Sequence, residues 1–244
     1  MVEYLMHRVA FFILILMICN SASLSAQVRW SVDFNLGLPG NVPAPLPMSQ
    51  TGKQRVSLLA VWSAEPFILP VNWMWRIGRW NDSKAWELET IHHKMVLQNR
   101  PDNIERLAIT HGFNTLTVNR AREIKKLILR AGAGIVLAHP ESSIDNLAFN
   151  EKSGLFKLGY YLTGPVLMVS AARPLRICKG FMVNLEGKTT IGYADVPIVN
   201  GRAQLLHLAF HLNAGLGLSV RRRLAGTREK SIQTEDSLMI PNNY

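Results

Sequence analysis

The stretch AQLLHLAFHLNAGLGLSV, residues Ala203–Val220, decides the fold class of this chain. From Leu206 to Val220 every second residue is apolar, while the residues between them are small or polar and include His207 and His211. Successive side chains of a β-strand point to opposite faces, whereas an α-helix repeats about every 3.6 residues. The alternation therefore predicts a long strand with one apolar face and one small or polar face.

The same period of two recurs along the chain after residue 27. It predicts nine strands, which cover residues 28–36, 55–64, 67–80, 85–98, 104–120, 127–137, 156–168, 181–193 and 203–220. In the strand predicted at 156–168, the pattern places Leu162, Val166 and Met168 on one face. Asn200-Gly201 is a dipeptide typical of a tight turn between two strands.

Prolines shape the interpretation of residues 41–80, of which 55–80 are the least certain. Prolines at 43, 45 and 47 predict a loop over residues 41–54, because proline lacks the hydrogen-bond donor that a central strand needs. Pro66 and Pro70 interrupt the alternation that follows. A barrel made from one bacterial chain has an even number of strands. Either one of the nine predicted strands is wrong, or a further strand is missed.

The composition limits the class of protein. Hydrophobic residues make up 48% and charged residues 18% of the 244 residues, whereas about a quarter of a soluble domain is charged. After the N-terminus no apolar run reaches the roughly 20 residues that a transmembrane helix needs. The net charge of +10 comes from scattered basic residues, so we expect no nucleic-acid partner. Anionic lipid head groups, a charged barrel lumen or a basic solvated surface would each account for it.

The N-terminus has the three parts of a secretory signal peptide. A short start with Arg8 precedes the apolar run VAFFILILMI at 9–18, and the small, polar residues NSASLSA follow at 20–26. We expect residues 1–26 to be removed by cleavage after Ala26, with a cut after Ser23 or an uncleaved anchor helix as alternatives. Once residues 1–26 are removed, Cys178 is the one cysteine left, so no internal disulfide is expected.

These observations predict an all-β fold: a single antiparallel up-and-down β-barrel of eight to ten strands over residues 27–220, embedded in a membrane. Residues 221–244 then form a basic and polar tail. The strands are long, their second face is rich in small residues, and aromatic residues gather near their ends, as lipid-embedded barrels require. The aromatic residues are Trp30, Trp62, Trp73, Trp75, Trp80, Trp86, Tyr160, Tyr161 and Tyr193. A periplasmic lipocalin-like carrier, with its apolar faces inward, is the soluble alternative.

The segment Asn213–Val220 resembles the last-strand signal of bacterial outer-membrane β-barrels. Asn213, Gly215, Leu218 and Val220 match the polar, glycine and apolar positions of that signal. The family ends at this strand on an aromatic residue, whereas this chain continues through a further 24 residues. The resemblance implies the outer membrane of a Gram-negative bacterium, contact with membrane lipids and lipopolysaccharide, and insertion by the barrel-assembly machinery.

The tetrapeptide His111-Gly112-Phe113-Asn114 resembles the His-any-Ser-Asn motif of lipid A deacylases, which are small outer-membrane barrels. By that resemblance His111 would be the general base and Asn114 would hold a substrate carbonyl or an oxyanion. Phe113 stands at the position of the nucleophilic serine, and a phenyl ring cannot attack an ester. Ser142 or Ser143 could replace the nucleophile only if folding brought one of them close to His111.

A polar network in the barrel lumen is the other candidate site. The alternation places Arg130, Glu186, Lys188, His207 and His211 on lumen-facing positions, where opposite charges can pair. His92 and His93 are strand neighbours and point to opposite faces, so they make a weak metal motif. No zinc, phosphate-loop or dinucleotide motif is present, so we expect neither metal nor cofactor. The sequence thus predicts an outer-membrane barrel without an assignable specific activity, either structural or interacting with small solutes or lipids, with a lipid-modifying acyl ester hydrolase as the alternative.

Overall fold

The computed structural model describes residues 28–150 and 153–221, which fold into strands joined by turns and loops. Within these two ranges no helix is long and apolar enough to cross a membrane. The strands are β1 (Val28–Asn41), β2 (Ala44–Gln50), β3 (Val56–Ala60), β4 (Trp62–Ser63), β5 (Trp73–Asn81), β6 (Lys84–His92), β7 (Met95–Leu97), β8 (Ile104–Ile124), β9 (Leu127–Ile144), β10 (Leu147–Ala148), β11 (Tyr161–Cys178), β12 (Phe181–Ile198) and β13 (Gly201–Arg221).

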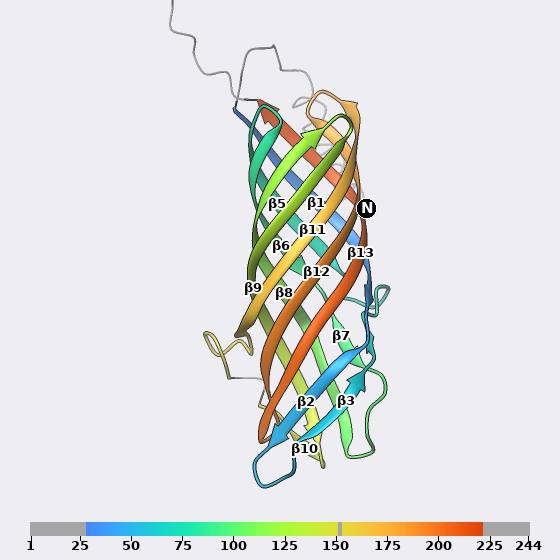
Figure 1. The fold of residues 1–244 in the computed structure, drawn as a ribbon, viewed down its shortest axis with the longest axis vertical. Coiled ribbons are helices and arrows are strands. Elements are labelled where there is room, and N and C mark those ends of the chain that lie inside the picture. The colour runs from blue at the N-terminus through green and yellow to red at the C-terminus, as the bar shows by residue number, and fades with distance from the viewer. Residues whose placement is uncertain (1–27, 151–152, 222–244) are drawn as a thin grey trace, which may run out of the picture.

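Eight of these strands close into an antiparallel barrel (Figure 1). Around the barrel the order is β1, β5, β6, β8, β9, β11, β12 and β13, so each barrel strand pairs with the next one along the chain. The ring is closed where β1 pairs with β13, from Arg29 opposite Arg221 to Asn41 opposite Ala209. The predicted up-and-down β-barrel is therefore confirmed.

The two ends of the barrel differ. At one end, called here the turn end, β1 begins, β13 finishes and short turns join β5 to β6, β8 to β9 and β11 to β12. At the other, called the loop end, β2, β3, β4, β7 and β10 extend the barrel (Figure 1, bottom). The predicted strand at 55–64 lies in this extension, as β3 and β4, and not in the barrel.

Three sequence predictions about single segments are wrong. The strand predicted at 67–80 begins only at Trp73, and residues 67–72 belong to a loop. Residues 44–50 form strand β2 and not a loop; Ala44, Leu46 and Met48 alternate inward to the core, while Pro45 lies outward in a stretch that pairs with β3 alone. The face predicted for 156–168 is also wrong, because the register shifts between Leu162 and Gly164. That irregularity turns Val166 and Met168 into the lumen, where they are buried.

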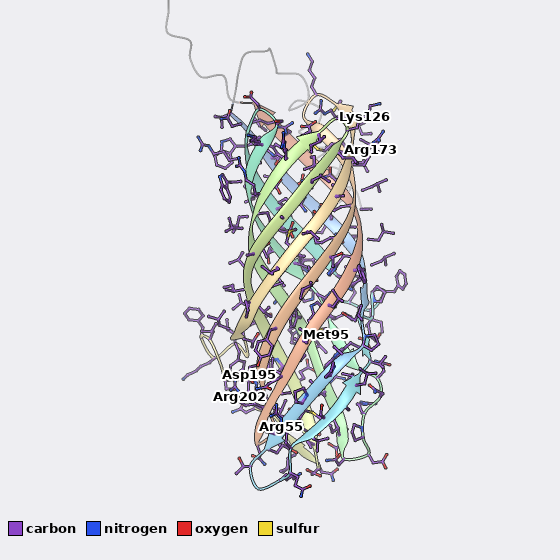
Figure 2. The ribbon with its side chains drawn as sticks, in the orientation of Figure 1. Arg55, Met95, Lys126, Arg173, Asp195 and Arg202 are labelled. Atoms are coloured by element: carbon purple, nitrogen blue, oxygen red, sulfur yellow. The ribbon has the colours of Figure 1, made fainter. Side chains whose placement is uncertain are left out.

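The barrel interior is filled in layers. Near the turn end lies a small apolar cluster around Trp80, whose indole nitrogen donates a hydrogen bond to Ser31 Oγ (3.0 Å). A layer of charged side chains and a layer of histidines follow. The loop-end half is filled by an apolar core, and Figure 2 labels Met95, one of its fully buried members. An eight-stranded barrel is just wide enough for its side chains to fill it.

Candidate functional site

The charged layer of the lumen centres on Arg76. Along β5, Met74, Arg76 and Trp80 alternate inward, while Trp75 and Ile77 lie outward. The guanidinium of Arg76 is 1% exposed and binds carboxylates from three other strands. Its partners are Glu186 on β12 (Nη2 to Oε2, 2.7 Å), Glu89 on β6 (Nε to Oε2, 2.7 Å) and Asp33 on β1 (Nη1 to Oδ2, 3.3 Å).

Two further cations complete this layer. Arg130 on β9 donates to Glu87 (Nε to Oε2, 2.7 Å) and to Glu186 (Nη1 to Oε2, 3.4 Å). Lys188 on β12 pairs with Glu89 on β6. In the ring of eight, β12 and β6 lie opposite each other, so this ion pair spans the lumen.

These ion pairs hold the barrel together across its width. Four carboxylates (Asp33, Glu87, Glu89 and Glu186) face three cations (Arg76, Arg130 and Lys188), with side-chain exposures between 0% and 5%. A buried charge that loses its partner costs about 3–5 kcal/mol, so each contact constrains its neighbours. The buried ion pairs therefore connect strands from different sides of the barrel.

A layer of histidines lies next to the charges. Asn41 Oδ1 accepts hydrogen bonds from His93 Nε2 (2.9 Å) and His207 Nε2 (3.2 Å). The ring of His93 meets those of His207 and His211 edge-on, with centroids 5.0 and 5.2 Å apart. His211 Nε2 bonds Thr190 Oγ1 (3.0 Å). Although the rings cluster, no group of three or more histidine, cysteine or acidic side chains in the described ranges is placed to hold a metal ion.

The structure groups the predicted lumen residues into these two adjacent layers. Arg130, Glu186 and Lys188 contact one another within the charged layer. His207 and His211 belong to the histidine layer, and His211 is the direct cross-strand neighbour of Lys188. Sequence reasoning missed Arg76, Glu87, Glu89 and Asp33, and it considered His93 only as part of a weak metal motif. Arg76 and Glu87 stand on inward positions of β5 and β6, between outward aromatic and aliphatic residues, which is the signal that could have found them.

The outer surface has the opposite character. Large apolar side chains cover it, including Leu212 (64% exposed) and Phe210 (56%) on β13, while His211 between them is 6% exposed. A water-soluble barrel points its apolar side chains inward, and a membrane barrel points them outward. The protein is a small β-barrel of the outer-membrane type.

Comparisons with known proteins find structural similarity at low sequence identity. No family model and no curated relative matches the chain. Among solved structures, it is similar to Ail, the attachment invasion locus protein of Yersinia pestis (8% identity, 79% of this chain and 99% of Ail covered, TM-score 0.39). It is also similar to Neisserial surface protein A (8% identity, 78% and 96%, TM-score 0.39) and to the outer membrane protein AlkL (10% identity, 84% and 96%, TM-score 0.45).

The two predicted catalytic candidates, His111 and Asn114, lie on the outer side of the barrel wall at an irregularity in β8. A register shift between Ile109 and Phe113 forms a bulge in β8, with Gly112 at a φ of 115°. Only glycine fits there, because a Cβ would meet Asn114 Oδ1 at 2.1 Å. His111 is exposed on the outside, while Phe113 is fully buried in the lumen against the ring of His207 (4.5 Å). Phe113, which stands at the position of the deacylase serine, therefore lies on the opposite side of the barrel wall from His111.

The outer side of the bulge carries a belt of aromatic and imidazole rings, defined by Trp73, His92, His111, His139 and Tyr160. Trp73 stacks on His92 (5.3 Å), and His139 meets His111 (4.7 Å) and Tyr160 (5.1 Å) edge-on. Asn114 joins the two halves of this ring belt, since its Oδ1 bonds His92 Nδ1 (2.9 Å) and its amide donates to the His111 carbonyl (3.3 Å).

The serines considered as replacement nucleophiles have other partners. Ser142 is buried in the lumen, where its Oγ accepts a hydrogen bond from the Val199 amide (3.0 Å). Ser143 Oγ donates to Glu105 Oε2 (2.9 Å) at the loop end. His111 and Asn114 are therefore brought together at the ring belt, whose aromatic side chains are typical of a membrane interface. In the part of the chain that the structure describes, neither serine bonds to them.

Proposed function

We propose that this protein is a closed, non-conducting outer-membrane barrel that works through its lipid-facing and loop-end surfaces. The carrying observation is the ion pair between Lys188 and Glu89, which connects strands on opposite sides of the lumen. Arg76 and Arg130 fill the same layer. A lumen crossed by buried ion pairs has no room for a passing solute.

Two side loops support contact with lipid. The loop between β4 and β5 exposes Phe67 (84%) and Leu69 (82%), and the loop before β11 exposes Phe156 (91%). Figure 1 shows both loops leaving the barrel wall sideways at a similar height. Side chains this exposed are stable where lipid covers them.

The loop-end extension is the part proposed to face the cell exterior, since outer-membrane barrels have short periplasmic turns and longer extracellular loops. Charged pairs cover its surface, such as Arg202 with Asp195 (2.9 Å) and Arg106 with Glu141 (2.8 Å). Figure 2 labels Arg55, Asp195 and Arg202 there. In this proposal the charged surface contacts lipopolysaccharide head groups.

Export and assembly complete the proposal. Residues 1–26, the predicted signal, lie outside the described residues, as do residues 222–244 of the predicted tail. We propose that a Gram-negative cell removes the signal and that the barrel-assembly machinery inserts the mature chain. The outward apolar surface supports this route, because such a surface is not compatible with a soluble periplasmic protein.

Conductance tests the proposal. The full mature protein, refolded into a planar lipid bilayer, should give no steady current steps, while a general porin recorded in the same apparatus gives them. Steady steps of uniform size from the wild-type barrel would refute the closed lumen. Steps that change in size in Glu89→Gln would also show that ions pass through the charged layer.

A further inference from the structure

Near the turn end, one row of outward residues alternates tryptophan and arginine across four strands. Trp30 on β1 is the cross-strand partner of Arg79 on β5, Arg79 of Trp86 on β6, and Trp86 of Arg120 on β8. Directly opposed side chains in a sheet lie about 4.5–5.5 Å apart at their Cβ atoms. The four side chains therefore form a continuous row, the Trp–Arg row, on the outer wall.

Further positive charge gathers around this row. Lys84 and Arg122 are cross-strand partners in the next row toward the turn end. In the described residues neither they nor Arg79 and Arg120 form an ion pair, although Asp82 lies in the adjoining turn. The guanidinium of Arg120 stacks over Trp86 (5.0 Å) and donates to the Ala85 carbonyl (3.3 Å).

Three members of the row, Arg79, Trp86 and Arg120, line a hollow of about 300 Å³ on the outer wall. Its walls are formed by Val28, Arg79, Asn81, Lys84, Trp86 and Arg120. Three cations, one amide and one indole thus surround a space open to the membrane side. A guanidinium binds a phosphate with two parallel hydrogen bonds, and an indole favours the head-group level.

The apolar wall is short above this row. On the outer face of β8 only Leu116 and Val118 separate Arg120 from Asn114 of the ring belt. At about 3.3 Å per residue and a tilt of about 40°, that distance is on the order of 15 Å along the barrel axis, against about 25 Å for the usual apolar band. On β13, opposite β8 in the ring, outward apolar residues continue from Leu206 to Val220.

A cation on the lipid-facing wall of a barrel is stabilised by an anion. A lipid-facing arginine costs about 2–4 kcal/mol at the midplane and about 0–1 near the interface. Arg79 and Arg120 lack carboxylate partners within the described chain, and a membrane lipid can supply the negative charge. In the leaflet at the turn end, that charge is the phosphodiester of a lipid.

We propose that the Trp–Arg row is a binding site for the head group of an anionic glycerophospholipid in the leaflet at the turn end. Arg79 and Arg120 bind the phosphate from both sides of Trp86, and Lys84 supplies a third positive charge. The inference rests on the proposed placement of the barrel in a membrane.

Native mass spectrometry tests this site. The mature protein is refolded in a neutral detergent and titrated with phosphatidylglycerol or phosphatidylcholine, and the lipids retained per barrel are counted. Wild type should retain phosphatidylglycerol in preference to phosphatidylcholine. The variant Arg79→Gln/Arg120→Gln should lose about tenfold in phosphatidylglycerol affinity, because two charge-assisted contacts to one phosphate disappear.

Two further variants distinguish a specific binding site from nonspecific electrostatic attraction. Lys125→Gln/Lys126→Gln removes the same charge from the neighbouring turn and should change the affinity less than twofold. Arg79→Lys/Arg120→Lys keeps both positive charges, so we expect it to fold like wild type. It should still weaken binding, because lysine lacks the planar guanidinium that donates two parallel hydrogen bonds to a phosphate. Faster migration of the unheated protein on gels reports folding of each variant.

The outcomes are distinct. Equal retention of both lipids by folded wild type overturns the site and leaves the closed barrel standing. An equal loss in the Lys125/Lys126 variant also overturns it, in favour of unspecific attraction. If wild type does not fold in detergent or lipid at all, the membrane placement itself fails, and the head-group site fails with it.

Discussion

At the residue scale, the two faces of strand β13 should differ in the polar substitutions that they tolerate. Phe210 lies outward and Ala209, fully buried, lies between His207 and His211 in the lumen. We predict that Phe210→Arg destabilises the folded barrel by about 2–4 kcal/mol, the cost of a lipid-facing arginine at the midplane. Ala209→Ser adds one hydroxyl and should cost less. Urea titrations of both variants in lipid vesicles measure the difference, and equal stability would contradict the assignment of faces.

The residues of the lumen show what alternation can predict and where it stops. Arg130, Glu186 and Lys188 were predicted to face inward from the pattern of their own strands. Arg76 has the same signal, but its partners lie on β1, β6 and β12, so its place at the centre depends on closure of the ring. The pattern within one strand predicts which face each side chain points to. It does not identify the partner of that side chain across the lumen.

At the scale of elements, the long strands were predictable and the irregular segments were not. The barrel strands keep the period of two over many residues, as in β13. The shift after Leu162 inserts one residue and reverses the facing of the residues that follow. The β8 bulge inserts two residues, so Ile109 and Phe113 both face the lumen while His111 between them lies outside. A local pattern does not register such insertions. Strand β2 escaped prediction because its prolines sit at positions that need no second partner strand.

The side loops are the elements whose environment can be tested most simply. A polarity-sensitive dye on Phe156→Cys, in a Cys178→Ser background, should emit at short wavelength in vesicles, because lipid surrounds that loop. The same dye on Arg55→Cys, in the loop-end extension, should emit as it does in water. Emission spectra of the two refolded variants provide the comparison, and a water-like spectrum at position 156 would refute lipid contact of this loop.

At the scale of the whole molecule, ion pairs connect opposite walls of the barrel, and the kind of side chain that fills the lumen changes along its length. Charges and histidines brace the lumen, an apolar core fills the loop-end half, and the outer wall changes from apolar strands to charged pairs toward the loop end. The wall is also uneven around its circumference, since the apolar stretch on β8 is shorter than that on β13. A lumen filled in this way leaves the outer surface as the part that can meet other molecules.

The central claim is that the apolar face of the strands lies in lipid, and one measurement tests it directly. Spin labels are placed singly at Leu206, Phe210, Leu216 and Arg202 in the Cys178→Ser barrel, refolded in vesicles, and their collisions with oxygen and with a water-soluble nickel complex are compared by electron paramagnetic resonance. We predict that oxygen dominates at the first three positions, most strongly at 210, and that the nickel complex dominates at 202. Access of the nickel complex to all four positions alike would contradict the claim and show a water-soluble barrel.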